Sequence, residues 1–140
     1  MSEECGGGCQ CGAVRYVVRG EPIALVACHC TECKRQSGSS FGMSLVVPRE
    51  NFEVSQGELK SFSRTPDRGG SLECFFCPGC GVRIYHASTN MADTFNIKAG
   101  TLDETADLTP AAHVFAGRKH PWLGLPDGVP CFETVPGAES

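Results

Sequence analysis

Cys77-Pro78-Gly79-Cys80-Gly81 is the stretch that decides the fold, because it has the composition of a zinc knuckle. Its Pro-Gly pair favours a tight turn that points both sulfur atoms and several backbone N–H groups at one ion. Cys74 also forms a CxxC pair with Cys77, but the Phe-Phe spacer between them is typical of a strand, on which residues three apart face opposite ways. The sequence therefore predicts Cys77 and Cys80 as half of a metal site, and Cys74 as a small buried hydrophobic residue.

A second pair, Cys9 and Cys11, precedes a stretch at 12–19 that is rich in β-branched residues and reads as a strand. In an extended chain, residues two apart face the same way, so both sulfurs can meet one ion. A zinc ion shared with Cys77 and Cys80 would tie this first strand to the hairpin expected at 71–85, and structural zinc contributes folding free energy directly. Cys5 lies outside this spacing, and we expect it to be a disordered bystander, although its glycine-rich tether would let it substitute as a ligand.

The third group is Cys28-His29-Cys30-Thr31-Glu32-Cys33, which places three thiols within six residues. Three thiolates bind Zn²⁺ and leave the fourth tetrahedral position for water or a substrate. The alternative is an ordinary closed site completed by a distant residue. Because neighbours on an extended chain face opposite ways, His29 is expected to point away from the ion. The candidates for a distant fourth ligand are Cys74, Cys131, His113 and His120. The two cysteines are more simply small buried hydrophobic residues, and the two histidines are more simply hydrogen-bonded structural residues.

Hydrophobic patterning predicts a mainly β protein with little helix. A short helical turn closed by glycine is expected at 34–38. The stretches 52–55 and 59–64, separated by a Gln56-Gly57 turn, resemble a β-meander. Trp122 is expected to pack and pin a tail rich in glycine and proline. The remaining expected strands lie at 23–27, 40–48, 71–76, 82–85, 95–100 and 112–116.

Composition excludes several classes of function. The chain has 140 residues, of which 41% are hydrophobic and 20% charged, as in one globular domain without a membrane-spanning stretch. The net charge is −4 and the basic residues are scattered, so nucleic acid is not an expected partner, although a pair of them could hold a small anion. The acidic, glycine-rich start differs from a secretory signal. We therefore expect a soluble cytoplasmic protein, whose ten cysteines are reduced and available for metal.

Three motifs together resemble the glutathione-dependent formaldehyde-activating enzyme family, also known as the CENP-V/GFA family. They are Gly8-Cys9-Gln10-Cys11-Gly12-Ala13-Val14-Arg15-Tyr16, Cys28-His29-Cys30-Thr31-Glu32-Cys33-Lys34 and Phe76-Cys77-Pro78-Gly79-Cys80-Gly81. The late His113-Val114-Phe115 and Lys119-His120-Pro121-Trp122 are similar to the family's C-terminal signature. Lys34 stands where an arginine is common in the family.

The resemblance implies a β-tent fold of small antiparallel sheets organised around a structural zinc. It implies a single zinc domain over 8–132, between a flexible N-terminus at 1–7 and a tail at 133–140. The structural zinc would lie on Cys9, Cys11, Cys77 and Cys80. The catalytic zinc would lie on Cys28, Cys30 and Cys33, which gives two zinc ions per chain.

The implied activity is that of a carbon–sulfur lyase that condenses glutathione, or another small thiol, with formaldehyde or a related aldehyde to an S-hydroxymethyl adduct. An open zinc position suits this reaction because a thiol becomes a stronger acid when a metal binds it. Lys34, Arg35 or Ser37 could bind a substrate carboxylate or stabilise the developing alkoxide. Two alternatives remain open: a zinc enzyme acting on another small electrophile, and a non-catalytic zinc-binding module or glutathione carrier.

Overall fold

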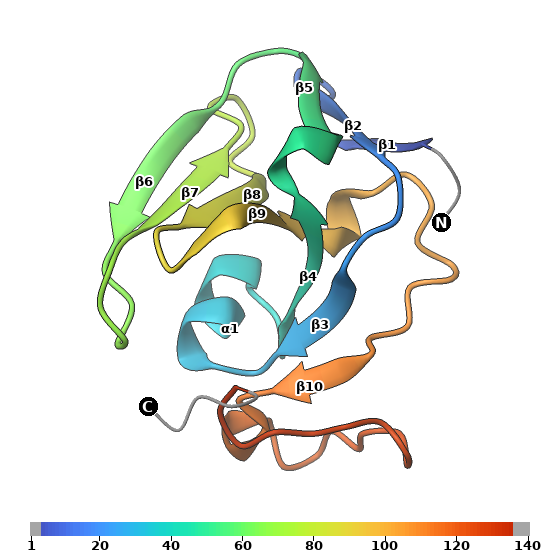
Figure 1. Cartoon of the computed structure of the whole chain (residues 1–140), viewed down its shortest axis with the longest axis vertical. Coiled ribbons are helices and arrows are strands. Elements are labelled where there is room, and N and C mark those ends of the chain that lie inside the picture. Colours follow the sequence, from blue (N-terminus) through green and yellow to red (C-terminus); the bar gives the residue numbers. More distant parts are fainter. Residues whose placement is uncertain (1–3, 136–140) are drawn as a thin grey trace.

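The computed structural model describes residues 4–135 and is built mainly from β-strands in two sheets, with one short α-helix near the centre (Figure 1). The helix is α1 (Thr31–Ser37). The strands are β1 (Glu4–Gly8), β2 (Arg15–Arg19), β3 (Ala24–Cys28), β4 (Gly42–Pro48), β5 (Phe52–Gln56), β6 (Lys60–Arg64), β7 (Leu72–Phe76), β8 (Arg83–Ser88), β9 (Met91–Lys98) and β10 (Ala112–Val114). Three 3₁₀ turns complete the set: η1 (Arg49–Asn51), η2 (Ala99–Thr101) and η3 (Ala116–Arg118).

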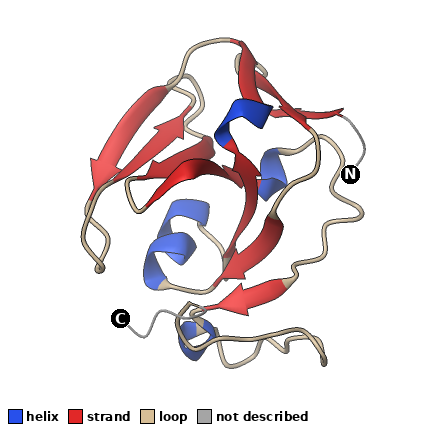
Figure 2. Cartoon of the chain, viewed as in Figure 1, coloured by secondary structure: helices blue, strands red, loops and turns tan. Residues whose placement is uncertain are grey.

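The smaller sheet has the order β1-β2-β5, and the larger has the order β10-β3-β4-β9-β8-β7-β6. All neighbouring strands are antiparallel except β10 and β3, which run parallel. Strands dominate the secondary structure, and helical segments are short (Figure 2). The expected mainly β fold of small sheets is confirmed.

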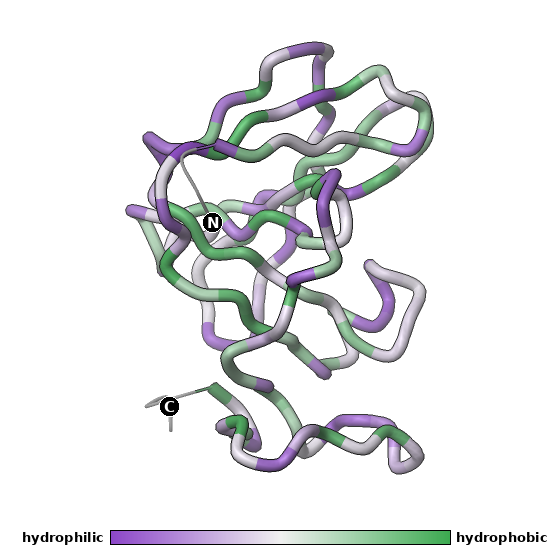
Figure 3. Tube along the Cα trace, turned by 90° about the vertical axis from the view of Figure 1, so that its right-hand side faces the viewer, coloured by the Kyte–Doolittle hydropathy of each residue, from purple (hydrophilic) through white to green (hydrophobic). Residues whose placement is uncertain are grey.

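The hydrophobic core lies where the two sheets meet. Tyr16 of β2, Val47 of β4, Ile84 of β8 and Ile97 of β9 are fully buried and belong to one contact cluster. Segments coloured as hydrophobic run through the middle of the molecule (Figure 3). Burial of these side chains is the main favourable contribution to the stability of the fold.

Two expectations about the N-terminal half are wrong. Residues 4–7 were expected to belong to a flexible segment, but they form most of β1, which pairs with β2. Cys5 is therefore part of a strand and packs against the core, rather than being disordered. β1 is not apparent from the sequence because Cys-Gly-Gly-Gly has a low strand propensity. Pairing with β2 overcomes this low propensity in the folded chain.

The expected meander of 52–55 and 59–64 is also wrong. β5 pairs with β2 in the smaller sheet, whereas β6 is the edge strand of the larger sheet and pairs with β7. Gly57, between them, has φ of +86°, and a Cβ there would lie 2.2 Å from the carbonyl oxygen of Ala13. The chain passes from one sheet to the other at this glycine, which a local hairpin pattern cannot reveal.

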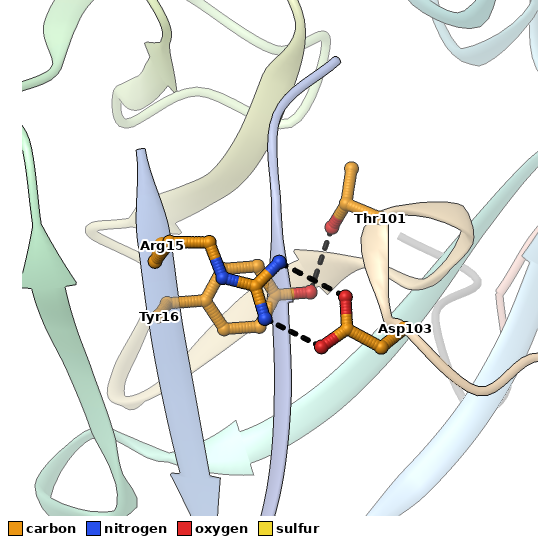
Figure 4. A network of polar contacts seen from close by, with 4 residues as sticks. All are labelled: Arg15, Tyr16, Thr101 and Asp103. Atoms are coloured by element: carbon orange, nitrogen blue, oxygen red, sulfur yellow. Dashed lines mark hydrogen bonds and ion pairs between the residues drawn. The ribbon is translucent and has the colours of Figure 1, made fainter. Parts of the chain in front are cut away.

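A polar network ties the smaller sheet to η2 and the chain beyond it (Figure 4). The Arg15 guanidinium donates two hydrogen bonds to the carboxylate of Asp103, which lowers the pKa of that carboxyl group. Thr101 Oγ1 donates to the carbonyl oxygen of Lys98, so the Tyr16 hydroxyl, 2.7 Å away, is the donor to Thr101. The core tyrosine thereby fixes the chain at the end of β9.

Tyr16→Phe is expected to lower the free energy of unfolding by about 1 kcal/mol, or Tm by about 4 °C, because it removes this hydrogen bond and leaves the ring packed. Tyr85→Phe is the matched control, since no hydrogen bond of the Tyr85 hydroxyl occurs within residues 4–135. Thermal unfolding followed by circular dichroism checks both variants. Equal loss in the two would contradict the assignment of the effect to the Tyr16–Thr101 bond.

The segment after β10 runs along the end of the larger sheet beside β10 (Figure 1). Backbone hydrogen bonds join His113 N to Pro130 O and Phe132 N to His113 O. Trp122 was expected to pack, but its side chain is 72% exposed, and Cys131 is exposed rather than buried. Within the described part of the chain, helices are too short and polar to cross a bilayer.

Candidate metal centres

Four cysteines from two distant turns converge in the structure. The Sγ atoms of Cys9, Cys11, Cys77 and Cys80 all lie within 4.8 Å of one another. Cys9 and Cys11 sulfurs are 3.6 Å apart, and Cys11 and Cys77 sulfurs, 66 positions apart in sequence, are 3.7 Å apart. Zn–S bonds of about 2.3 Å in a tetrahedron place the sulfurs about 3.8 Å apart. The spacing of this cluster therefore fits a zinc ion.

Backbone N–H groups face the sulfurs of this cluster. Val14 N donates to Cys9 Sγ at 3.2 Å, and Gly79 N donates to Cys77 Sγ at 3.3 Å. Hydrogen bonds from the backbone of Val82 and Cys11 lower the pKa of Cys80 to about 6. Such donors stabilise thiolates, which are the form of cysteine that binds metal. The Pro-Gly turn supplies the Gly79 donor, and the chain around the other two cysteines supplies those of Val14 and Cys11. Cys74 is outside the cluster and buried in β7.

The second cluster forms where β3 ends and α1 begins. The Sγ atoms of Cys28, Cys30 and Cys33 lie within 4.8 Å of one another. Cys28 is the last residue of β3, Cys30 is the N-cap of α1, and Cys33 lies in its first turn. Cys30 Sγ accepts a hydrogen bond from Cys33 N at 3.3 Å, as an N-cap side chain does. The strand end and the helix cap together hold the three thiols on one side of the junction.

Hydrogen bonds among the thiols of the second cluster shift their pKa values in opposite directions. Hydrogen bonds from the side chains of Cys28 and Cys33 lower the pKa of Cys30 to about 2. The pKa of Cys28 is raised, chiefly by its hydrogen bond to Cys30. The Cys30 thiolate thus accepts hydrogen bonds from its protonated neighbours, and a cation that binds all three sulfurs would displace those protons.

The second cluster contains three candidate protein ligands among the described residues. Among residues 4–135, no other Cys, His, Asp or Glu places a ligand atom within 4.8 Å of all three sulfurs. His29 is fully buried, and its Nε2 lies 2.9 Å from Nδ1 of His113, so these two histidines bind each other rather than completing the cluster. Cys74, Cys131 and His120 are also outside it. Within residues 4–135, the three-thiol group therefore has no fourth protein ligand.

The basic residues next to the second cluster have different environments. Lys34 Nζ donates to the carbonyl oxygen of Arg118, so it joins α1 to the C-terminal segment. Arg35 and Ser37 each border a pocket beside α1, and Cys33 borders the same pocket as Arg35. Sequence reasoning did not find Lys98 and His86, which line that pocket from β9 and β8. The available signal for Lys98 was its place directly after the alternating apolar residues Phe95 and Ile97 of β9.

Comparison with known proteins shows the family. The family model described as glutathione-dependent formaldehyde-activating enzyme matches residues 4–118. A protein of Fusarium vanettenii with the provisional name glutathione-dependent formaldehyde-activating enzyme is 28% identical over 79 residues, which are 55% of this chain and 41% of the relative. The match thus spans less than half of that relative's length.

A solved structure supports the fold independently. The crystal structure of a Rhodobacter sphaeroides protein is 21% identical, covers 75% of this chain and 91% of its own, and superposes with a TM-score of 0.57. At this identity the likeness concerns the arrangement of the strands alone.

Proposed function

The chain belongs to the glutathione-dependent formaldehyde-activating enzyme family, and from this premise we propose that it is a zinc-dependent carbon–sulfur lyase. Its substrates would be a small thiol, glutathione in the family's name, and formaldehyde or a related aldehyde. The observation that carries the proposal is the open group of Cys28, Cys30 and Cys33, whose three sulfurs converge without a fourth protein ligand among the described residues.

The two cysteine clusters would have different roles. Cys9, Cys11, Cys77 and Cys80 would hold a structural zinc, because four thiols complete a tetrahedral site. Cys28, Cys30 and Cys33 would hold a second zinc with one position free. When bound, this zinc supplies Lewis-acid chemistry, which lowers the pKa of a thiol and stabilises it as a thiolate.

The reaction joins the thiol sulfur to the carbonyl carbon. The C=O π bond breaks as the C–S bond forms, and the proton lost by the thiol ends on the former carbonyl oxygen, giving R–S–CH₂–OH. The chain contributes mainly by holding the two reactants together, since effective molarity is large for well-oriented partners. The pocket that Cys33 shares with residues of β6 to β9 is the place where the thiol's remaining atoms would lie.

The experiment is a rate measurement on anaerobically purified, zinc-loaded protein. Formaldehyde and glutathione are mixed, and formation of S-hydroxymethylglutathione is followed by exchange NMR against the uncatalysed rate. We expect faster exchange that requires the thiol, with a rate proportional to protein concentration.

Two other results would contradict the proposal in different ways. Consumption of formaldehyde without any thiol would indicate a zinc enzyme acting directly on an electrophile. Binding of glutathione without faster exchange, tested over several thiols and aldehydes, would indicate a non-catalytic zinc module or thiol carrier.

A further inference from the structure

A basic pocket lies between α1 and one face of the larger sheet, and Cys33 of the open cluster forms part of its wall. Its volume is about 200 Å³. The ribbon shows α1 lying beside β8 and β9, with β6 and β7 beyond them (Figure 1). We define the basic pocket by the residues that carry the argument: Cys33, Arg64, Arg83, His86 and Lys98.

Strand alternation explains why these side chains gather. Side chains two apart on a strand share a face, and directly paired residues on neighbouring strands also share one. Cys74 of β7 pairs with His86 of β8 and with Phe62 of β6, so the three form one row across the sheet. Lys98 follows the core residue Ile97 on β9 and therefore faces away from the core, toward the same pocket.

The charges that line the pocket are unbalanced. Four cationic side chains contribute to it, Arg35, Arg64, Arg83 and Lys98, against one carboxylate, that of the exposed Glu32. The chain as a whole has the opposite sign, with a net charge of −4. Across residues 4–135, no salt bridge joins any of the four cations to a carboxylate; the ion pairs found there belong to Arg15 and Arg19.

Lys98 is the innermost of these cations. Its Nζ makes one side-chain hydrogen bond within the described residues, to His86 Nδ1 at 2.8 Å. The pKa of His86 is lowered to about 3 by burial and by the nearby charges of Lys98, Arg64 and Arg83, so the imidazole is neutral and accepts this bond. Burial lowers the pKa of Lys98, and an anion bound beside it would raise that pKa again. The ammonium form has three N–H donors, which leaves two for a ligand.

We propose that the basic pocket binds the carboxylate of a small acidic thiol while the sulfur of that thiol lies at the open cysteine cluster. This inference rests on the proposed function for the position of the sulfur, and it adds the charge of the substrate. Lys98 and Arg64 are specificity-determining residues in this account, because they distinguish an anionic thiol from a neutral or cationic one.

The test compares 3-mercaptopropionate with its neutral counterpart 3-mercaptopropan-1-ol, by isothermal titration calorimetry on zinc-loaded protein in the absence of aldehyde. We expect the acid to bind at least about tenfold more tightly, because hydrogen bonds to a charged group are the strong ones. The preference should weaken as salt is added. Equal affinities would overturn the proposal.

Two pairs of variants show which residues cause the preference for the acidic thiol. Lys98→Met is expected to abolish the preference for the acid, whereas Lys60→Met, at an exposed position of β6, keeps it. Arg64→Gln should reduce the preference about threefold or more, and Arg68→Gln, on an exposed turn four residues later, should leave it unchanged. The arginine pair provides the test if Lys98→Met fails to fold. An unchanged preference in Arg64→Gln, or equal loss in Arg68→Gln, would also overturn the proposal.

The calorimetric result is independent of catalysis. Selective binding of the acid with no acceleration of adduct formation would support the basic pocket and reject the lyase. Acceleration with every thiol, at rates that ignore charge, together with equal affinities, would support the lyase and reject the basic pocket.

Discussion

The Cys77→Ser variant is expected to lose cooperative folding at temperatures where the unaltered chain is fully folded. Cys77 is 1% exposed, and its sulfur lies in the four-cysteine cluster that joins the turn after β1 to the turn between β7 and β8. Structural zinc contributes on the order of 10 kcal/mol, which is as large as the whole stability of a typical domain. A serine hydroxyl cannot replace the thiolate, so the variant should lose both the ion and the cross-link.

Thermal unfolding by circular dichroism, with zinc content measured on the same samples, checks this prediction. Cys131→Ser is the matched control, because Cys131 is exposed and lies outside both clusters. The control should unfold at the temperature of the unaltered chain. A Cys77→Ser variant that retains that temperature would show that the four-cysteine cluster has no structural role.

The Cys30→Ser variant is expected to keep the fold and lose at least about 100-fold in the rate of adduct formation, because proximity effects of this size depend on the intact open site. Cys30 is the N-cap of α1, and its side chain accepts a hydrogen bond from Cys33 N. Serine is among the preferred N-cap residues, so α1 should begin at the same place. The change therefore removes one metal ligand without removing the local support for the helix.

The measurements are the thiol-dependent exchange rate and the thermal unfolding temperature of the same preparation. Cys131→Ser again serves as the control and should keep both. A Cys30→Ser variant with an undiminished rate would remove the open cluster from the reaction. A variant that loses rate only in proportion to its unfolded fraction would assign Cys30 a structural role.

Much of the fold could be predicted because its determinants are local. β-branched runs bounded by glycine or proline indicated most strands, and the glycine at 38 correctly ended the helix, since Gly38 has φ of +64°. The pairing of Cys77 with Cys80 followed from turn chemistry, whereas Cys9 and Cys11 lie in a turn between β1 and β2 and not on the extended chain that the sequence predicted. These patterns depend on residues that are close in sequence, so they can be recognised without knowledge of the fold.

Strand pairing was the part that local patterns could not supply. β1 exists because it pairs with β2, and β5 and β6 separate because each finds its partner in a different sheet. The basic pocket has the same origin. Lys98, His86 and Arg64 come from three strands, and only the register of the larger sheet places them on one face beside Cys33. In the sequence, each of these three residues looks like an ordinary polar residue of the protein surface.

We expect the chain to hold one closed zinc site and one open one. The most direct test is the ratio of zinc to protein by elemental analysis of anaerobically purified chain, combined with the sulfur coordination of zinc by X-ray absorption. The account predicts two zinc ions per chain, one for each cluster, falling to one in Cys30→Ser, with the remaining ion bound by four sulfurs. One zinc ion in the unaltered chain, with the same four-sulfur coordination in Cys30→Ser, would contradict the account and leave the three-thiol group without a metal.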